Sequence, residues 1–329
     1  MEKVTKLMVI RQGGRSRVGL GASVPLWFAV AVPREENMTA QPYRTSVAES
    51  RAIERPRSRC PVLPAPVRPD PERWPDDRAT FAWLGHATVL ANFHGVWILT
   101  DPALETRIGV GRGRAKLGPR RLIAPALRPN ELPDIDLLLL SHAHMDHTDL
   151  GTLRALRRDV HVVIQPGNRD LVRRFRRVEE LAWGERMTVD GTEIESVEVR
   201  HWGARMITDR HRGYGGYLLR RGGRTVLFAG DTAYTDAFAP LAQRGPIDLA
   251  ILPIGAYDPW IANHASPEQA WRMAREMGAA HVLPVHHSTF RLSREPTQEP
   301  IERLLQAAGP ERDRVVVTRV GETWSLPER

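Results

Sequence analysis

Three histidines and one aspartate lie within six residues of one another, in the run Ser141-His142-Ala143-His144-Met145-Asp146-His147. The run directly follows residues 135–140, a continuous apolar stretch that predicts a strand buried on both faces. In a loop after such a strand the two alternate histidines can point the same way, while Asp146 and His147 face a neighbouring point. Neutral imidazole and carboxylate suit Zn²⁺, with Mn²⁺ or Fe²⁺ as alternatives. The run therefore predicts a site for two metal ions.

Further ligands are expected at the ends of other strands, because two adjacent metal ions need about seven or eight protein donors together with a bridging oxygen. Three candidates follow expected strands: His201 after residues 192–200, Asp231 after residues 225–229 and His286 after residues 281–285. The predicted metal ligands are then His142, His144, Asp146, His147, His201, Asp231 and His286.

The elements that must position these side chains alternate between strand and helix patterns. Strands are expected at residues 81–84, 88–93, 96–100, 135–140, 161–164, 192–200, 216–220, 225–229, 249–253, 281–285, 315–319 and 323–326. Helices are expected near residues 150–157, 168–175, 236–243, 267–277 and 301–308. Two halves of strands, each with helices, predict an α/β fold of the four-layer αββα type.

The chain divides into a leader and a folded domain. Residues 1–78 hold ten of the 26 prolines and show neither helical nor strand periodicity, so we expect a poorly ordered leader before a folded domain at residues 79–329. Basic residues precede an uncharged stretch at residues 18–32, which is the layout of a secretory signal. Pro25 interrupts that stretch, so a cytoplasmic protein is the prediction, and export directed by residues 1–31 is the alternative.

Composition excludes several classes of protein. The chain has 47 Lys and Arg against 39 Asp and Glu, but residues 1–78 alone contribute 14 against 9, so the folded part is close to neutral. No nucleic-acid partner is expected on that ground. The single cysteine, Cys60, allows no intrachain disulfide and no cysteine-based zinc finger. No apolar run is long enough to span a membrane. Composition leaves the oligomeric state open.

The ordered ligand set resembles the metallo-β-lactamase superfamily of binuclear metal hydrolases. Further motifs narrow the resemblance to the branch that contains N-acylphosphatidylethanolamine-hydrolysing phospholipase D. They are Trp83-Leu84-Gly85-His86-Ala87-Thr88, Thr100-Asp101-Pro102, Gly118-Pro119-Arg120-Arg121, Phe228-Ala229-Gly230-Asp231-Thr232, Ile254-Gly255-Ala256-Tyr257 and His264-Ala265-Ser266-Pro267-Glu268. The similarity runs from about residue 78 to the C-terminus.

The resemblance implies a division of the ligands between two Zn²⁺ ions per chain. One ion is expected on His142, His144 and His201, the other on Asp146, His147 and His286, with Asp231 bridging them. A hydroxide held between the ions is then the nucleophile. Asp146 and His264 are the predicted catalytic residues, since His264 matches a histidine of the family's active site. His86 and Asp101 are expected to orient the ligands, with a buried polar pair that stabilises the loops as the alternative.

A glycine-rich, arginine-rich loop at residues 107–121 is the predicted contact for an anionic substrate, with a solvated mobile loop as the alternative. The predicted substrate-binding residues are Arg112, Arg114, Lys116, Arg120 and Tyr257. The expected substrate is a lipid or small phosphodiester of the N-acylphosphatidylethanolamine type, reached through a peripheral membrane contact. A lactonase or other ester hydrolase is the main alternative. A nuclease and a non-catalytic metal-binding domain are weaker ones.

Overall fold

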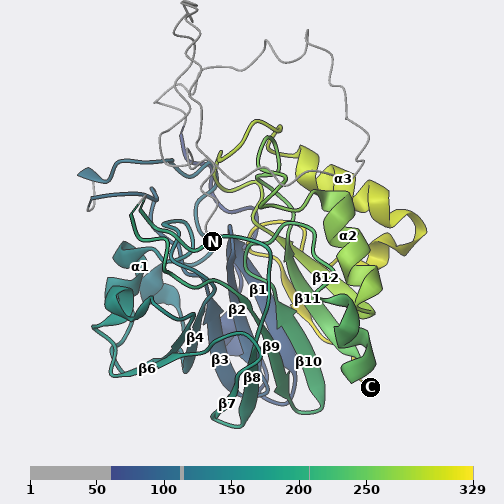
Figure 1. The fold of residues 1–329 in the computed structure, drawn as a ribbon, viewed down its shortest axis with the longest axis horizontal. Helices are drawn as coiled ribbons and strands as arrows, with labels where there is room; N and C mark the ends of the chain where they lie inside the picture. The colour runs from purple at the N-terminus through teal and green to yellow at the C-terminus, as the bar shows by residue number, and fades with distance from the viewer. Residues whose placement is uncertain (1–60, 112–114, 207, 329) are drawn as a thin grey trace, which may run out of the picture. The chain divides into compact units, whose positions relative to one another are not determined.

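The computed structural model describes residues 61–111, 115–206 and 208–328, which form two β-sheets with helices outside them (Figure 1). The first sheet has the order β13 (Thr323–Ser325), β1 (Ala79–Gly85), β2 (Thr88–Phe93), β3 (Val96–Thr100), β4 (Leu137–Leu140), β5 (His161–Ile164) and β6 (Arg177–Glu180). The second has the order β12 (Ala279–Val285), β11 (Ile247–Pro253), β10 (Arg224–Phe228), β9 (Gly216–Arg221), β8 (Thr192–Val197) and β7 (Arg186–Val189).

The two sheets share one apolar core, to which both contribute buried side chains such as Leu138 and Phe228. Tyr217 of β9 crosses this core, and its hydroxyl donates a hydrogen bond to the carbonyl of Leu140 at 2.8 Å. A second apolar cluster lies between the second sheet and helices α2 (Pro267–Glu276) and α3 (Glu299–Ala308). Helix α1 (Leu150–Ala155) lies beside β4 (Figure 1). These four layers confirm the predicted αββα sandwich.

Parallel strands bring the predicted ligands to one edge of the fold. Strands β3 to β6 run parallel in the first sheet, and β10, β11 and β12 run parallel in the second. All four residues of β4 are buried because sheet and helix cover both of its faces. The loops after β4, β10 and β12 carry the predicted ligands, so the carboxyl ends of these strands define what we call the ligand edge.

Several expected elements differ in the structure. Residues 168–175 and 236–243 contain 3₁₀ helices, Arg169–Val172 and Ala239–Arg244, in place of α-helices. Residues 315–319 form no strand, and only Val315 pairs with Val282 as an isolated bridge. Strands β6 and β7 were not expected, because each has only four residues and neither contains an apolar run.

The predicted boundary at residue 78 also needs correction, because residues 61–78 belong to the described fold. Leu63 donates to the carbonyl of Leu122 and accepts from the amide of Ala124, both at 2.8 Å. Trp74 stacks on Trp97 of β3, with ring centroids 5.5 Å apart. Prolines deprive this segment of periodicity without preventing it from packing on the domain. Residues 1–60, including Cys60 and the secretory-signal candidate, lie outside the described residues.

Candidate metal centre

Six of the seven predicted ligands lie in the loops after β4, β10 and β12, and His201 lies in the loop at residues 198–215, between β8 and β9. His142 to His147 leave β4, His286 leaves β12, and Asp231 leaves β10 after Gly230. Gly230 has a φ of 62°, and a Cβ at this position would lie 2.5 Å from the Cβ of Ser141. Only glycine therefore allows the β10 loop to approach the β4 loop this closely.

The first group of donors consists of His142, His144 and His201. His144 Nδ1 lies 2.8 Å from His142 Nε2 and 3.3 Å from His201 Nε2. The three ring nitrogens are close enough to bind one metal ion together.

The outer ring nitrogens of this group fix the tautomers. His201 Nδ1 lies 2.9 Å from the carbonyl oxygen of Asn263, which can only accept, so Nδ1 carries the proton. Ser141 Oγ donates to Asp101 Oδ2 at 2.5 Å, and it therefore accepts from His142 Nδ1 at 2.8 Å. In both histidines the Nε2 lone pair is left to face the first group, as metal binding requires.

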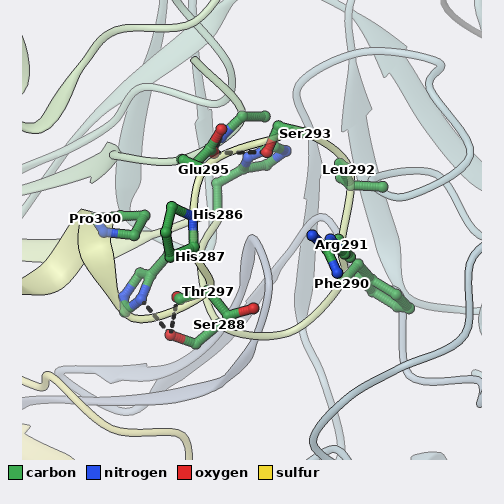
Figure 2. Close-up of a pocket in the computed structure, with 13 residues that line it drawn as sticks. His286, His287, Ser288, Phe290, Arg291, Leu292, Ser293, Glu295, Thr297 and Pro300 are labelled. Carbon is green, nitrogen blue, oxygen red and sulfur yellow. Dashed lines mark hydrogen bonds between the residues drawn. The ribbon is translucent and has the colours of Figure 1, made fainter. Parts of the chain in front are cut away.

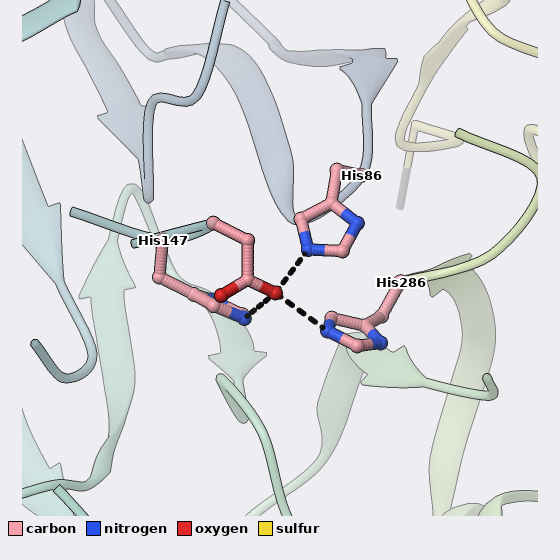
Figure 3. A group of neighbouring side chains, drawn as sticks. His86, His147 and His286 are labelled. Carbon is pink, nitrogen blue, oxygen red and sulfur yellow. Dashed lines mark hydrogen bonds and ion pairs between the residues drawn. The ribbon is translucent and has the colours of Figure 1, made fainter. Parts of the chain in front are cut away.

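The second group of donors surrounds one oxygen of Asp146 (Figure 3). Asp146 Oδ2 lies 2.9 Å from His86 Nε2, 3.5 Å from His286 Nε2 and 3.6 Å from His147 Nε2. His147 Nδ1 donates to Asp101 Oδ2 at 2.7 Å, so the Nε2 of His147 also presents its lone pair to the group. His86, predicted to orient ligands, thus lies among the candidate ligands themselves.

Asp231 lies between the two groups. Its Oδ2 is 3.0 Å from His147 Nε2 and 3.2 Å from His286 Nε2. The same oxygen is 3.8 Å from His201 Nε2 and 4.0 Å from His142 Nε2. One carboxylate therefore faces donors of both groups, as the predicted bridging ligand must.

The donor set fits divalent cations. Asp231 Oδ1, His147 Nε2 and both ring nitrogens of His286 are buried without a hydrogen-bond partner. Buried polar atoms without a partner are costly, whereas lone pairs that converge from imidazoles and carboxylates are what zinc-class ions bind. We therefore identify this cluster as a candidate centre for two metal ions.

The pKa values of histidines in the centre are shifted in both directions. Burial lowers the pKa of His144 to about 3 and that of His201 to about 4. Burial also acts on His286, but Asp231 and Asp146 outweigh it and raise its pKa to about 9. For Asp231, burial is outweighed by His147 and His286, which hold its pKa well below the usual range. The buried carboxylates of Asp146 and Asp231 are thus stabilised by positive charge beside them, which metal ions bound between the two groups can supply.

His264 lies close to two of the predicted ligands, His201 and Asp231, with ligand atoms of the three all within 4.8 Å of one another. Its side chain is 4% exposed, and its Nδ1 lies 3.8 Å from Asp231 Oδ2 without a hydrogen-bond partner. Burial holds its pKa well below the ordinary value, so the ring is neutral at pH 7. The predicted catalytic histidine therefore lies within reach of the bridging carboxylate.

Arg205 is a functional residue that the sequence did not indicate. Its Nη1 donates to the carbonyl oxygens of Ala143 and Thr148, at 2.7 and 2.8 Å. These carbonyls lie on both sides of the ligands that leave β4, and Arg205 itself lies four residues after His201. One guanidinium therefore holds two ligand loops together. The sequence contains no motif that would identify an arginine whose partners are main-chain carbonyl groups.

The structure describes three of the five predicted substrate-binding residues, and each of the three contacts other parts of the protein. Arg112 and Arg114 lie outside the described residues. Lys116 is 4% exposed, and its ammonium contacts Asp149 and Glu105, the latter at 2.5 Å. These contacts give Lys116 a structural role in place of the predicted substrate contact, because its charge is already neutralised.

The remaining two have other surroundings. Arg120 lies in a hairpin, where its main chain pairs with that of Arg107. Tyr257 is buried, and its hydroxyl donates to Glu299 of α3 at 2.8 Å.

A small pocket adjoins the second group of donors, inside the loop at residues 286–300 (Figure 2). Glu295 closes the loop, because its carboxylate accepts from the amide of Ala256 and the hydroxyl of Ser293, both at 2.6 Å. The pocket is lined by His286 and His287 and has a volume of about 20 Å³. That is room for about one water molecule, so this pocket does not accommodate a phospholipid headgroup.

Comparisons with known proteins agree with this geometry. Residues 96–287 match the model of the β-lactamase superfamily domain. An uncharacterised protein of Mycobacterium tuberculosis is 34% identical over 274 residues, which cover 80% of this chain and 73% of that protein. N-acyl-phosphatidylethanolamine-hydrolysing phospholipase D 1 of Caenorhabditis elegans is 30% identical over 273 residues, which cover 75% of this chain and 76% of that enzyme.

A solved structure shows the same fold. Isothiocyanate hydrolase from Delia radicum gut bacteria superimposes with a TM-score of 0.62 at 20% sequence identity. The superposition covers 76% of this chain and 100% of that protein. At this level of identity the likeness supports the fold alone.

Proposed function

Because this chain belongs to the metallo-β-lactamase superfamily as a metal-dependent hydrolase, we propose that it uses two metal ions to hydrolyse a lipid phosphodiester of the N-acylphosphatidylethanolamine type. The observation that carries the binuclear part is the position of Asp231, whose Oδ2 faces imidazoles of both donor groups at 3.0 to 4.0 Å. The resemblance to the worm phospholipase supports the choice of substrate.

The residues of the chain divide the work in this mechanism. His142, His144 and His201 hold the first ion, and Asp146, His147 and His286 hold the second, while Asp231 is shared. Ions at these positions supply the activation of a water molecule at neutral pH. His264 lies beside the shared carboxylate, and its neutral ring would donate a hydrogen bond to the departing alcohol.

The distribution of apolar surface supports a lipid substrate. The large apolar side chains that are exposed in the described part of the chain are Leu63, Val110, Leu117, Trp183, Met206 and Ile261. The main chains of Val110 and Leu117 pair across one hairpin. Lys116 of this hairpin forms an ion pair with Asp149, which lies two residues after His147. Met206 follows the loop of His201, and Ile261 lies three residues before His264. Exposed apolar side chains on loops that carry or flank the predicted site residues favour a bilayer surface as the partner, because lipid can cover them.

The test of the proposed function combines metal analysis with turnover of a panel of substrates. The expected result is about two zinc-class ions per chain and hydrolysis of N-acylphosphatidylethanolamine. If the protein hydrolyses only a lactone or a carboxylic ester, the proposed phosphodiesterase activity is wrong and the protein is an ester hydrolase. Turnover of RNA alone would assign a nuclease, and no turnover with full metal content would leave a metal-binding domain.

The membrane contact has its own test. Replacing Val110 and Leu117 by serine should weaken co-sedimentation with vesicles of phosphatidylcholine and N-acylphosphatidylethanolamine. Turnover of a short-chain, water-soluble phosphodiester should stay unchanged, because neither side chain contacts the donor groups. Unchanged binding to vesicles would contradict the contact, and the proposed hydrolysis would still stand.

A further inference from the structure

We propose that His86 is a direct ligand of the second metal ion, in addition to Asp146, His147, His286 and the shared Asp231. This inference rests on the proposed binuclear centre and names one more protein donor in it. His86 belongs to the loop between β1 and β2, which supplies no other residue of the donor groups.

The distances among the donors support ligation. Two zinc ligands at about 2.1 Å from the metal and at a tetrahedral angle lie about 3.4 Å apart. His86 Nε2 lies 2.9 Å from Asp146 Oδ2, while His286 and His147 lie 3.5 and 3.6 Å from the same oxygen. His86 thus faces the same oxygen as the two predicted imidazole ligands, from hydrogen-bonding distance, and a metal ion among them would need a shift of only about 0.5 Å at His86 (Figure 3).

The ring of His86 is fixed by its neighbours. The side chain is 1% exposed and lies edge-on to Phe290, with ring centroids 5.1 Å apart. The ring centroid of His286 is 4.2 Å away on another side. A ring packed in this way keeps its Nε2 aimed at the donor group, as a ligand of a rigid site must.

The backbone of His86 is held in an unusual conformation. Its φ is 57°, and that of His286 is 64°, both in the left-handed region that few non-glycine residues adopt. The amide of His86 donates to Thr289 Oγ1 at 2.7 Å, and its carbonyl accepts from Trp83 Nε1 at 2.7 Å and from the amide of His286 at 2.9 Å. Three hydrogen bonds thus maintain a strained backbone whose effect is to direct this imidazole into the centre.

A crystal structure of the zinc-loaded protein tests the proposal directly. The expected result is a distance of about 2.0 to 2.3 Å between His86 Nε2 and the second zinc ion. A distance above about 3 Å, with both ions present, would overturn the proposal and leave the proposed function intact. A zinc-loaded structure without a second ion would overturn both.

Metal affinity provides a test in solution. His86→Gln should loosen binding of the more weakly held zinc ion at least about tenfold in competition with a chromophoric chelator. The matched control is His287→Gln, because His287 is also buried beside His286 but lies outside the donor groups. Equal affinities of the two variants would contradict the proposal. If His86→Gln does not fold, the crystal structure of the zinc-loaded wild-type protein still tests whether His86 binds the second ion.

Discussion

Asp101→Asn should weaken metal binding at both predicted positions. The carboxylate of Asp101 is fully buried, and its Oδ2 accepts from Ser141 Oγ at 2.5 Å and from His147 Nδ1 at 2.7 Å. Ser141 Oγ in turn accepts from His142 Nδ1 at 2.8 Å. One carboxylate thus sets the tautomer of a ligand in each donor group, directly for His147 and through a hydroxyl for His142.

The size of the effect follows from the hydrogen bonds that change. Asparagine keeps the shape of aspartate but replaces one acceptor oxygen by a donor NH₂ group. Asp101 Oδ1 also accepts from the amide of Ser141 at 2.7 Å, so either placement of the NH₂ group loses a hydrogen bond. With NH₂ at the Oδ2 position, His147 loses its hydrogen bond or moves its proton to Nε2, where the metal ion is expected. A hydrogen bond to a charged group contributes about 1.5 to 3 kcal/mol, and about 2 kcal/mol corresponds to roughly 30-fold in affinity. We expect about this loss at the second position and a smaller one at the first, where the effect passes through Ser141.

Zinc titration against a chromophoric chelator measures both affinities. Asp136→Asn is the control, because its carboxylate accepts from the amide of Trp97 at 2.9 Å and is absent from the donor groups. That variant should bind zinc as the unchanged protein does. If Asp101→Asn keeps both affinities, the carboxylate does not set the tautomers and the reasoning is refuted.

Three other substitutions and one condition test the rest of the centre. Asp231→Ala should lower both metal occupancies in elemental analysis, because both positions share this carboxylate; loss of a single ion would exclude the bridging role. His264→Ala should lower kcat by about 10² to 10⁴ while metal content stays unchanged, and full turnover would remove His264 from the mechanism. Arg205→Met should reduce zinc affinity more than Arg212→Met, since the guanidinium of Arg212 pairs with Asp170 and Asp209 and not with the carbonyls beside the β4 ligands. Equal effects would show that the contacts of Arg205 do not support the ligands. After metal removal with EDTA, the free energy of unfolding should fall as the pH drops below about 6.5, by about 1.4 kcal/mol per pH unit for each of His144 and His201. The reason is that their pKa values are lowered in the folded protein, so only the unfolded chain takes up protons in this range. A metal-free protein whose stability does not change in this pH range would contradict the prediction.

The fold and the gathering of the predicted ligands could be anticipated because both depend on apolar runs. Strand β4 is buried on both faces and reads as an uninterrupted apolar segment, and β11 and β12 are almost as apolar. Ligands placed directly after such strands share an edge whenever the strands are parallel. The short strands β6 and β7 carry no comparable signal, because they lie at the ends of their sheets and only one residue of each is buried.

The contacts that support the ligands could not be anticipated in the same way. Lys116 belongs to a loop whose composition predicts solvent exposure, yet its ammonium is drawn inward by Asp149, which also caps α1. Arg205 reaches main-chain carbonyls, and these are identical at every position of a sequence. Both cases depend on long-range packing, which residue types and spacing do not encode.

The backbone at the centre shows why its residues cannot be replaced by better local choices. His86, Asp101 and His286 all have positive φ, at 57°, 33° and 64°. Each such non-glycine residue costs of the order of 1 kcal/mol or more, and glycine would relieve that strain but remove the donor. The strain is offset by hydrogen bonds, such as the one from the amide of His286 to the carbonyl of His86. The three loops thus keep a strained backbone conformation because that conformation points an imidazole or a carboxylate into the centre. Strain confined to such positions is expected of a site selected for its chemistry.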